Sequence, residues 1–429
     1  MTEQRAIKIA LVTTFYPPFS FGGDGIYVRR MAHALARMGC DVHIIHDADA
    51  YRTLAPKGGD LIPLDEPAGV TVHRMESSLG ALSPVLTQQF GRPIANGKKL
   101  KALLNDGFDV THFHNISLVG GPGILSLGSG IKLYTAHEHW LVCPMHILWR
   151  HGREVCDKRE CFRCQLKAHR PPQAWRQTGY LHRQAEKIDA FIALSQSSAD
   201  NHAAFGFRQP MRVLPTFIPD LDVSKSPTKE QTGAWGKRPY ALFVGRLEKI
   251  KGLQDLMPLF VENPVADLVI AGDGDYEAEL RQVAGASKHI HFLGRLASDE
   301  LDDLYRDALA VLTPSACYEV FPLVALEAFR ASTPIIAREL GPYPEIVEAS
   351  QAGFLFNTKH EAAEALEKLA SDAALQAKMG QSGRQAYEKK WSEKPALKAY
   401  FRLISETANA KGLTRLSGES DRLAQILST

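Results

Sequence analysis

The sequence lacks any run of about 18 apolar residues, so it predicts no membrane-spanning helix. Net charge is also small, at +2 from 50 Lys and Arg against 48 Asp and Glu, so no global field indicates a nucleic-acid partner. Six cysteines in 429 residues are too few for a secreted disulfide scaffold. An early acidic residue and Lys8 interrupt the first apolar run, which indicates a buried strand and not a signal peptide. These absences favour a cytoplasmic globular protein.

Two series of short apolar runs alternate with helical patterns. A chain of this length predicts two domains. Strand, helix and strand at this spacing predict βαβ units and a parallel sheet in each half. A helix is expected over 25–39, ended by Gly39. The predicted strands are 8–14, 40–46, 108–114, 131–137 and 189–195 in the first half, and 238–246, 267–274, 290–296, 309–315 and 333–339 in the second.

A stretch rich in Pro, Ser, Thr and charge, 215–239, predicts the boundary between the two domains. We therefore expect two Rossmann-like α/β domains facing a cleft, with ligands at the carboxyl ends of the strands. The expected N-terminal domain is 1–218, with a Cys-rich basic insertion at about 138–187. The C-terminal domain is 219–395, and 396–429 forms a helical tail.

Two turns of the second half carry charged side chains. Arg246 and Lys251 follow a predicted strand, where a guanidinium fork and an ammonium suit phosphate; the alternative is a surface turn with two exposed cations. Asp273 and Asp275 could hold a divalent metal, but a glycine-flanked turn with an N-capping aspartate is favoured.

The apolar stretch CYEVFPLVALEA keeps two carboxylates. Pro322 suits the first turn of a helix, which places Glu319 in the loop before that helix and Glu327 within it. The first amides of the helix would face an anion. The alternative is that both glutamates are ordinary helix charges.

The ordered pieces G-R-L-x3-K-G, A-G-D-G, F-L-G-R, P-S-x2-Y-E-x-F-P-L-x3-E-A and G-x-x-P-E-I-V resemble the retaining GT-B glycosyltransferases of family 4. The resemblance covers nearly the whole chain and implies the GT-B fold. Residue by residue, it implies that Arg246 and Lys251 hold the donor diphosphate. Glu319 would lie beside the transferred sugar, and Glu327 would bind the ribose.

The resemblance also implies further site residues. The backbone of Phe321, Pro322 and Leu323 would contact the distal phosphate and the sugar. Val320 stands where the family usually has glycine, which leaves the choice of sugar open.

In the first half, the glycine-rich loop FSFGGDG is similar to the loop of the family that approaches the donor or acceptor. Gly22 and Gly23 permit close backbone approach, although alone they indicate only a turn. His137, at the end of a predicted strand, matches the active-site histidine of the family. His112 and His114 are interpreted as hydrogen-bonded core or rim residues.

The insertion carries four cysteines, Cys143, Cys156, Cys161 and Cys164, spaced C-x12-C-x4-C-x2-C. This spacing is compatible with a structural zinc site or an iron–sulfur cluster, with a disulfide or redox pair, and with free thiols. Between Arg150 and Lys187, ten Lys and Arg against four Asp and Glu give a net +6. Such a segment suits a phosphate-bearing acceptor or an anionic membrane at the inner face, or is a solvated loop.

The combined expectation is a retaining glycosyltransferase that needs no cofactor or metal for catalysis. It would move a sugar from a nucleotide-diphosphate sugar to a glycan, lipid-linked or small-molecule hydroxyl, with no nucleic-acid partner. One alternative is a sugar-nucleotide epimerase or a phosphorylase-type enzyme on the same fold. Another is a metal- or partner-binding module with a degenerate cleft.

Overall fold

The computed structural model describes residues 5–55, 61, 64–214, 216–221, 238–261 and 264–428. Two compact units make up the chain. Unit 1 comprises Met1–Thr216 and Glu393–Thr429, and unit 2 comprises Phe217–Ser392. Within the expected boundary stretch, residues 215 and 222–237 lie outside the described residues.

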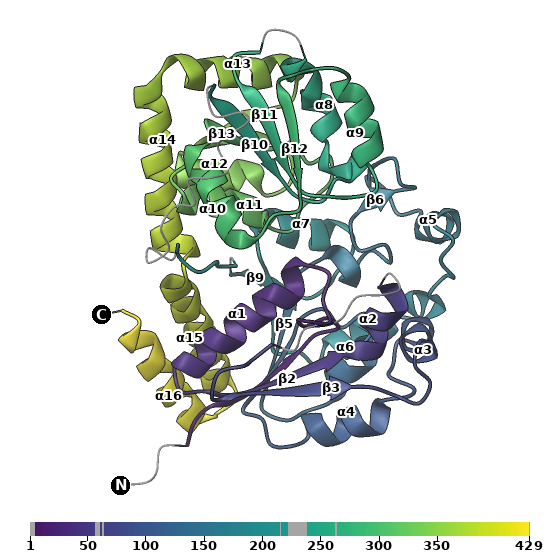
Figure 1. The fold of residues 1–429 in the computed structure, drawn as a ribbon. Coiled ribbons are helices and arrows are strands. Elements are labelled where there is room, and N and C mark those ends of the chain that lie inside the picture. Colours follow the sequence, from purple (N-terminus) through teal and green to yellow (C-terminus); the bar gives the residue numbers. More distant parts are fainter. Residues whose placement is uncertain are drawn as a thin grey trace. The chain divides into compact units, whose positions relative to one another are not determined.

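Unit 1 is built on a parallel sheet that, in the described residues, has seven strands in the order β3-β2-β1-β4-β5-β8-β9 (Figure 1). All five strands predicted for this half are confirmed in position. The strands are β1 Lys8–Val12, β2 Asp41–Asp47, β3 Val70–Met75, β4 Val110–Phe113, β5 Ile131–Ala136, β8 Ala190–Ala193 and β9 Met211–Val213.

Helices join these strands. Helix α1 follows β1 and buries Val28, Met31 and Leu35, and its end before Gly39, which has a φ of 83°, confirms the predicted stop. The other helices of this part are α2 Ala48–Leu54, α3 Leu82–Phe90, α4 Gly97–Leu104, α6 Tyr180–Ala185 and α7 Gln196–Ala204, after α1 Gly23–Arg37.

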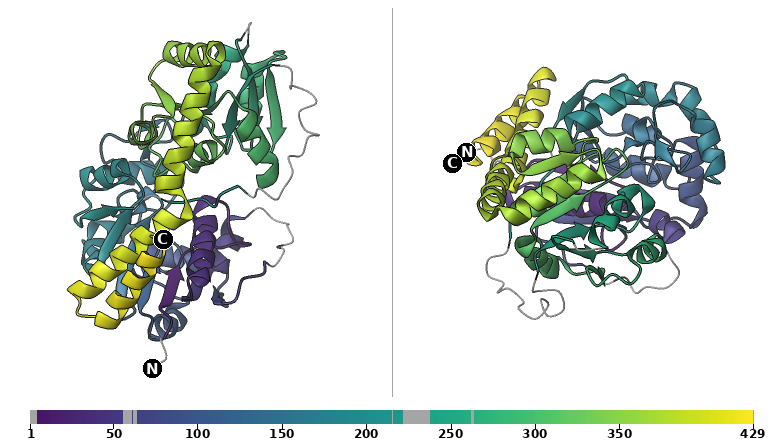
Figure 2. Two further views of the ribbon diagram at one scale, coloured as in Figure 1. Left: turned by 90° about the vertical axis from the view of Figure 1, so that its left-hand side faces the viewer. Right: turned by 90° about the horizontal axis from the view of Figure 1, so that it is seen from above.

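The C-terminal segment belongs to unit 1. Helices α15 (Glu393–Ala410) and α16 (Thr414–Ile426) lie side by side, as the yellow pair in Figure 2. The Tyr400 hydroxyl of α15 is 3.2 Å from Nδ1 of His112 on β4, and Lys411 forms an ion pair with Asp189. The segment predicted as a helical tail therefore packs against the rest of unit 1.

The insertion between β5 and β8 has little regular structure. It contains a hairpin of β6 (Trp149–Arg150) and β7 (Glu154–Val155), and the short helix α5 (Cys161–Lys167). One-turn 3-10 helices at His139–Leu141 and Ala174–Gln177 flank it.

Unit 2 is a second parallel sheet, six-stranded in the described residues, in the order β12-β11-β10-β13-β14-β15. The five strands predicted for this half are confirmed. They are β10 Tyr240–Val244, β11 Asp267–Ala271, β12 Ile290–Gly294, β13 Ala310–Thr313 and β14 Ile335–Arg338, and β15 Gly353–Phe356 was not predicted.

Both faces of the second sheet are covered. Strand residues alternate between the faces, so Leu242 packs with α10, α11 and α12, and Phe243 packs with α8, α9 and α13. This is the doubly wound arrangement expected from the sequence. The helices are α8 Leu253–Leu256, α9 Glu277–Ala284, α10 Ser298–Asp307, α11 Leu323–Arg330, α12 Tyr343–Ser350, α13 Lys359–Ser371 and α14 Ala373–Ala386.

Candidate active site

The turn after β10 carries the two predicted phosphate-binding cations. Arg246 is 69% exposed and pairs with Glu248 at 2.8 Å. Lys251 ends a one-turn 3-10 helix, Lys249–Lys251, and Gly252 follows with a φ of 71°. A guanidinium that is largely in solvent is available to an incoming anion because its single surface ion pair is weak.

Lys251 and Glu319 are brought together. Nζ of Lys251 lies 2.7 Å from Oε1 of Glu319, which also accepts a hydrogen bond from the Ser315 hydroxyl at 2.8 Å. Burial raises the pKa of Glu319, but the charge and hydrogen bond of Lys251 outweigh this effect and hold the pKa below its ordinary value. Burial likewise lowers the pKa of Lys251, and Glu319 reverses the shift. Both groups are therefore charged at neutral pH.

Glu327 follows Glu319 in the sequence and lies on α11. Its Oε2 accepts a hydrogen bond from the buried hydroxyl of Tyr305 at 2.7 Å. Burial, followed by the charge of Glu327, raises the pKa of Tyr305 well above its ordinary value. The hydroxyl therefore stays protonated and donates a hydrogen bond to Glu327. The Tyr305 hydroxyl thus orients one oxygen of the Glu327 carboxylate.

The expected helix after Glu319 is present, with one correction. Pro322 occupies the N-cap position, and the helix begins at Leu323, so the proline precedes the first turn that it was predicted to occupy. Proline at the cap still removes one amide that no helical carbonyl would accept. The ring of Phe321 packs edge-on against Trp391 at 6.4 Å, and Val320 is 9% exposed.

Asp273 and Asp275 are not helix caps. The N-cap of α9 is Tyr276, which makes no side-chain capping bond, so the capping role predicted for an aspartate is wrong. Instead the carbonyl of Asp273 accepts a hydrogen bond from the amide of Leu247 at 2.7 Å. This bond links the turn after β11 to the turn after β10. Among the residues that the structure describes, no group of three or more His, Cys, Asp or Glu is arranged to hold a metal ion.

In unit 1, Gly22 is the N-cap of α1, and Gly23 is its first residue. Asp24 follows and accepts a hydrogen bond from the Asn115 side chain, beyond the end of β4, at 3.0 Å. Burial and then the charge of Glu138 raise the pKa of Asp24 to about 6. The segments that follow β1, β4 and β5 thus meet at the carboxyl ends of adjacent strands.

His137 is part of a histidine cluster. Its Nε2 lies 2.9 Å from Nδ1 of His114, and its ring is 5.0 Å from that of Tyr27. Burial lowers the pKa of His137 to about 3, so the ring is neutral at physiological pH. His112 and His114 are buried and hydrogen-bonded, as their interpretation as core residues requires.

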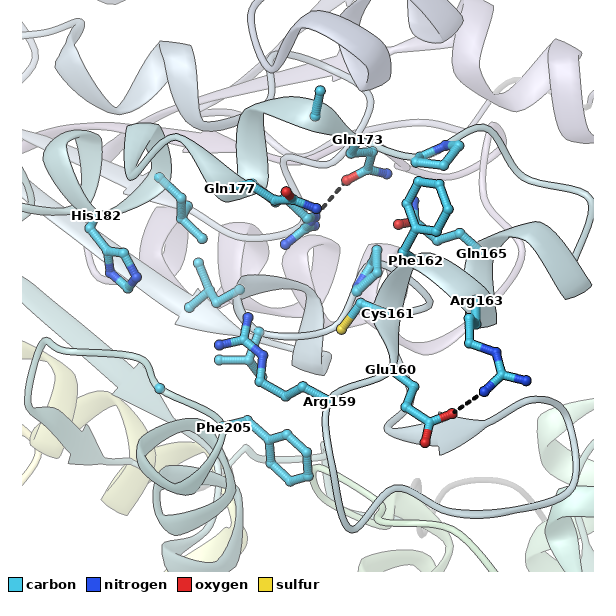
Figure 3. Close-up of a pocket in the computed structure, with 18 residues that line it drawn as sticks. Arg159, Glu160, Cys161, Phe162, Arg163, Gln165, Gln173, Gln177, His182 and Phe205 are labelled. Atoms are coloured by element: carbon cyan, nitrogen blue, oxygen red, sulfur yellow. Dashed lines mark hydrogen bonds and ion pairs between the residues drawn. The ribbon is translucent and has the colours of Figure 1, made fainter.

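The insertion encloses a pocket of about 540 Å³ (Figure 3). Arg159, Phe162, Gln177 and His182 surround it, and Glu160 at its rim pairs with Arg163. Arg176 lies against the rings of Trp140 and Trp175, 5.1 and 4.6 Å from their centroids. Its Nη1 donates to the Trp140 carbonyl, whereas its Nη2 is buried with no hydrogen-bond partner among the described residues. The pocket volume is in the range of small-molecule sites.

The four cysteines of the insertion border a second, small cavity of about 20 Å³. None of them is in a disulfide. Cys143 is buried, and Cys156, Cys161 and Cys164 are partly exposed. The sequence spacing therefore corresponds to a real convergence of the four side chains.

Sequence reasoning missed the residues that hold the predicted ones. Ser315, Tyr305, Asp24 and Asn115 are common residue types outside the motifs, so no local pattern distinguishes them. The one available signal for Ser315 was its place, after Pro314, at the start of the motif that contains Glu319.

Comparisons with known proteins agree across both units. Residues 21–220 match the family described as Glycosyltransferase Family 4, and residues 224–386 match Glycosyl transferases group 1. An uncharacterised glycosyltransferase of Methanocaldococcus jannaschii is 29% identical over 358 residues, which is 80% of this chain and 83% of that protein.

Solved structures share the fold. Sucrose-phosphate synthase from Thermosynechococcus elongatus aligns over 94% of this chain and all of its own, with a TM-score of 0.69 and 21% identity. The Anabaena protein HepE, crystallised in complex with UDP, aligns over 93% of this chain and 99% of its own, with a TM-score of 0.64 and 18% identity. The matches span both domains in order, and the chain therefore belongs to the family 4 glycosyltransferases, sugar-transferring enzymes of GT-B fold.

Proposed function

We propose that this enzyme transfers a sugar from a nucleotide-diphosphate sugar with retention of anomeric configuration, and that the transfer step needs no metal. The observation that carries the proposal is the charged cluster of unit 2, in which Lys251 is held by Glu319 beside the start of α11. Arg246 acts electrostatically on both residues. HepE binds UDP, which supports a nucleoside-diphosphate donor for this chain as well.

In this proposal the cations act on the leaving group. Breaking the bond between sugar and phosphate leaves a diphosphate with additional negative charge, which Arg246 and Lys251 stabilise together with the first amides of α11. Fixed positive charge at the leaving group supplies what a divalent cation would otherwise supply. Phe321 and Leu323 would contribute backbone contacts to the distal phosphate and the sugar.

The carboxylates have separate roles. Glu319, already ionised, would accept hydrogen bonds from hydroxyls of the transferred sugar. Glu327, oriented by Tyr305, would accept from the ribose. Neither is assigned as a nucleophile, and the leaving phosphate would take the acceptor proton. Val320 is the side chain that we expect to limit which sugar fits.

On the acceptor side, the neutral His137 would donate or accept a hydrogen bond next to the reacting centre, and Gly22 and Gly23 would allow close backbone approach. The cationic pocket of the insertion favours an acceptor that carries phosphate, such as a lipid-linked glycan. The exposed Phe162 and Leu166 on α5, next to Arg163 and Lys167, suit contact with an anionic membrane.

Donor binding is tested with the double substitution Arg246→Ala and Lys251→Ala. We expect nucleoside-diphosphate affinity to fall by at least about tenfold, because a charge-assisted hydrogen bond contributes about 1.5–3 kcal/mol. The control is Arg306→Ala with Lys378→Ala, two exposed cations of the same unit. Calorimetric titration measures the affinity, and a folded double variant that binds normally would remove the assignment.

The reaction itself is tested separately. Incubation with a panel of nucleotide sugars, with and without acceptors, separates transfer from epimerisation, which needs no acceptor. Proton NMR of the product gives the anomeric configuration, and inversion would contradict the proposal. Flotation with anionic and neutral vesicles tests the membrane contact, which is excluded if the enzyme ignores anionic vesicles and prefers a neutral soluble acceptor.

A further inference from the structure

The cysteine cavity of the insertion has the composition of a metal site. Cys143 lies just beyond the 3-10 turn after β5, Cys156 directly follows β7, and Cys161 and Cys164 are one turn apart at the start of α5. All four border the same cavity of about 20 Å³. A space of this size holds about one water-sized particle. The cavity lies where three backbone segments meet, which are also linked by the His151–Glu160 contact at 2.8 Å and by the Cys156 amide, which donates to the Leu148 carbonyl at 2.7 Å.

The backbone around the cavity is unusually constrained. Six non-glycine residues of the described chain have a positive φ, and four of them lie in this short insertion: His146, Leu148, His151 and His169. Each such conformation costs about 1–3 kcal/mol and persists only where surrounding structure fixes it. A hairpin of two-residue strands does not supply that stability by itself. A cross-link in addition to the ion pairs of Arg150 and His151 would therefore stabilise the insertion.

We propose that Cys143, Cys156, Cys161 and Cys164 bind one structural zinc ion as a tetrahedral tetrathiolate. Zinc is held in this way at Zn–S distances of about 2.3 Å, and each thiol loses its proton on binding. The thiols of Cys156 and Cys164 now face the carbonyls of Lys158 and Trp149, at 3.3 and 4.0 Å. The described residues contain no group of three or more donors already arranged for a metal, so binding would require these two thiols to rotate toward the ion.

The surroundings of the thiols suit an anionic complex. The amide of His151 donates to Sγ of Cys164 at 3.4 Å, a contact that stabilises a metal-bound thiolate. Four thiolates and one Zn²⁺ carry a net charge of −2. Arg176 acts electrostatically on Cys143 and Cys161 and would offset part of that charge. Arg150 and Glu160 also line the cavity, where Arg150 pairs with Glu154 and Asp157 and lies 4.0 Å from Glu160.

The size of the cavity favours a single ion over a cluster. An iron–sulfur cluster contains several iron and sulfide atoms, which need much more room than this cavity offers. Among single divalent ions, zinc binds such sites more tightly than ferrous iron. The ion would fix the segment between Cys156 and Cys164, which forms one wall of the large pocket through Arg159 and Phe162.

The test is metal analysis of the full-length enzyme purified without chelator. We expect about one zinc per chain, released as a mercurial reagent titrates the thiols and detected with a chromogenic chelator. Cys161→Ser with Cys164→Ser should reduce bound zinc at least tenfold. The control is Cys40→Ala, which removes a buried cysteine just before β2, outside the insertion. This variant should retain one equivalent of zinc.

Each outcome is decisive. Less than about a tenth of an equivalent of zinc in the wild-type protein overturns the proposal, and so does iron with acid-labile sulfide. A disulfide within the insertion, found by mass spectrometry, also overturns it. If the double variant does not fold, the metal content and thiol titration of the wild-type protein still decide. Activity is not the readout, so failure here leaves the proposed transfer reaction untouched.

Discussion

At the scale of single residues, two of the side chains that we assign to the donor are held by other side chains. Lys251 is fixed by Glu319, and Glu327 is fixed by Tyr305. A carboxylate that is already oriented loses little conformational entropy when it binds a hydroxyl. We therefore expect the partners to contribute to donor binding along with the residues that we propose touch the ligand.

Tyr305→Phe tests this positioning. The substitution removes the hydroxyl that donates to Glu327 and should weaken nucleoside-diphosphate binding by about threefold to tenfold, the equivalent of one net hydrogen bond of about 1 kcal/mol. Calorimetric titration measures the change. Because Tyr305 acts through Glu327, combining Tyr305→Phe with Glu327→Ala should weaken binding no further than Glu327→Ala alone.

The matched control is Tyr240→Phe. Its buried hydroxyl donates to the Leu304 carbonyl at 2.9 Å in the same unit, away from the carboxylates. We expect Tyr240→Phe to lower stability by a similar amount and to leave nucleotide affinity unchanged. Equal loss of affinity in both variants would show that Tyr305 has only a structural role.

At the scale of elements, the turn with Lys251 packs directly on the loop with Glu319. The amide of Ala316 donates to the Ile250 carbonyl at 2.8 Å. A Cβ on Gly252 would lie 2.1 Å from the Pro314 carbonyl oxygen, and the φ of Gly252 is 71°. Glycine is therefore required here both by conformation and by space.

Gly252→Ala should force these two segments apart. An alanine in the left-handed backbone conformation alone costs about 1–2 kcal/mol, and we expect the clash to raise the loss of stability to roughly 3 kcal/mol or more. We also expect weaker nucleotide binding. Thermal unfolding and calorimetric titration measure the two effects. Gly294→Ala is the control in the same unit, because its φ is 70° and no atom lies within 4 Å of the added Cβ. Similar losses in the two variants would contradict the close packing.

The sequence predicted the central strands and the edge strand β12, but not the other three edge strands. β3, β9 and β15 lie at sheet edges, and their residues are mostly half-buried or exposed. β3 and β9 form no apolar run, and β15 is only four residues long. Motifs indicated Arg246, Lys251, Glu319 and Glu327 as donor-site candidates, because their spacing depends on one local turn or helix. The contact of Tyr400 with His112 joins residues 288 positions apart, and no local pattern carries that information.

At the scale of the whole molecule, the two units respond to different conditions. The charged groups that we assign to the donor lie in unit 2, so nucleotide should stabilise that unit. Unit 1 instead buries several neutral histidines. Burial lowers the pKa of His112, His137 and His139 to about 3, and it also holds the pKa of His114 well below its ordinary value.

Unit 1 should therefore be sensitive to mild acid. A histidine with a lowered pKa in the folded state favours folding above its unfolded pKa of about 6.5, and that contribution is lost as the pH falls below 6.5, because the unfolded chain then binds more protons. For a fully buried ring such as His112, the loss between pH 6.5 and pH 5 is about 2 kcal/mol. Denaturant unfolding at a series of pH values measures this slope.

The histidine contribution is isolated by comparing two variants. His112→Gln removes one buried titrating group and should flatten the dependence of unit 1 stability on pH by about one proton between pH 6 and pH 4. His360→Gln removes a histidine whose side chain is 84% exposed, and should leave the slope as in the wild type. The comparison uses the slope and not the absolute stability, because His112→Gln also loses hydrogen bonds to Thr135 and Tyr400. An unchanged slope in His112→Gln would mean that this ring is already protonated in the folded unit.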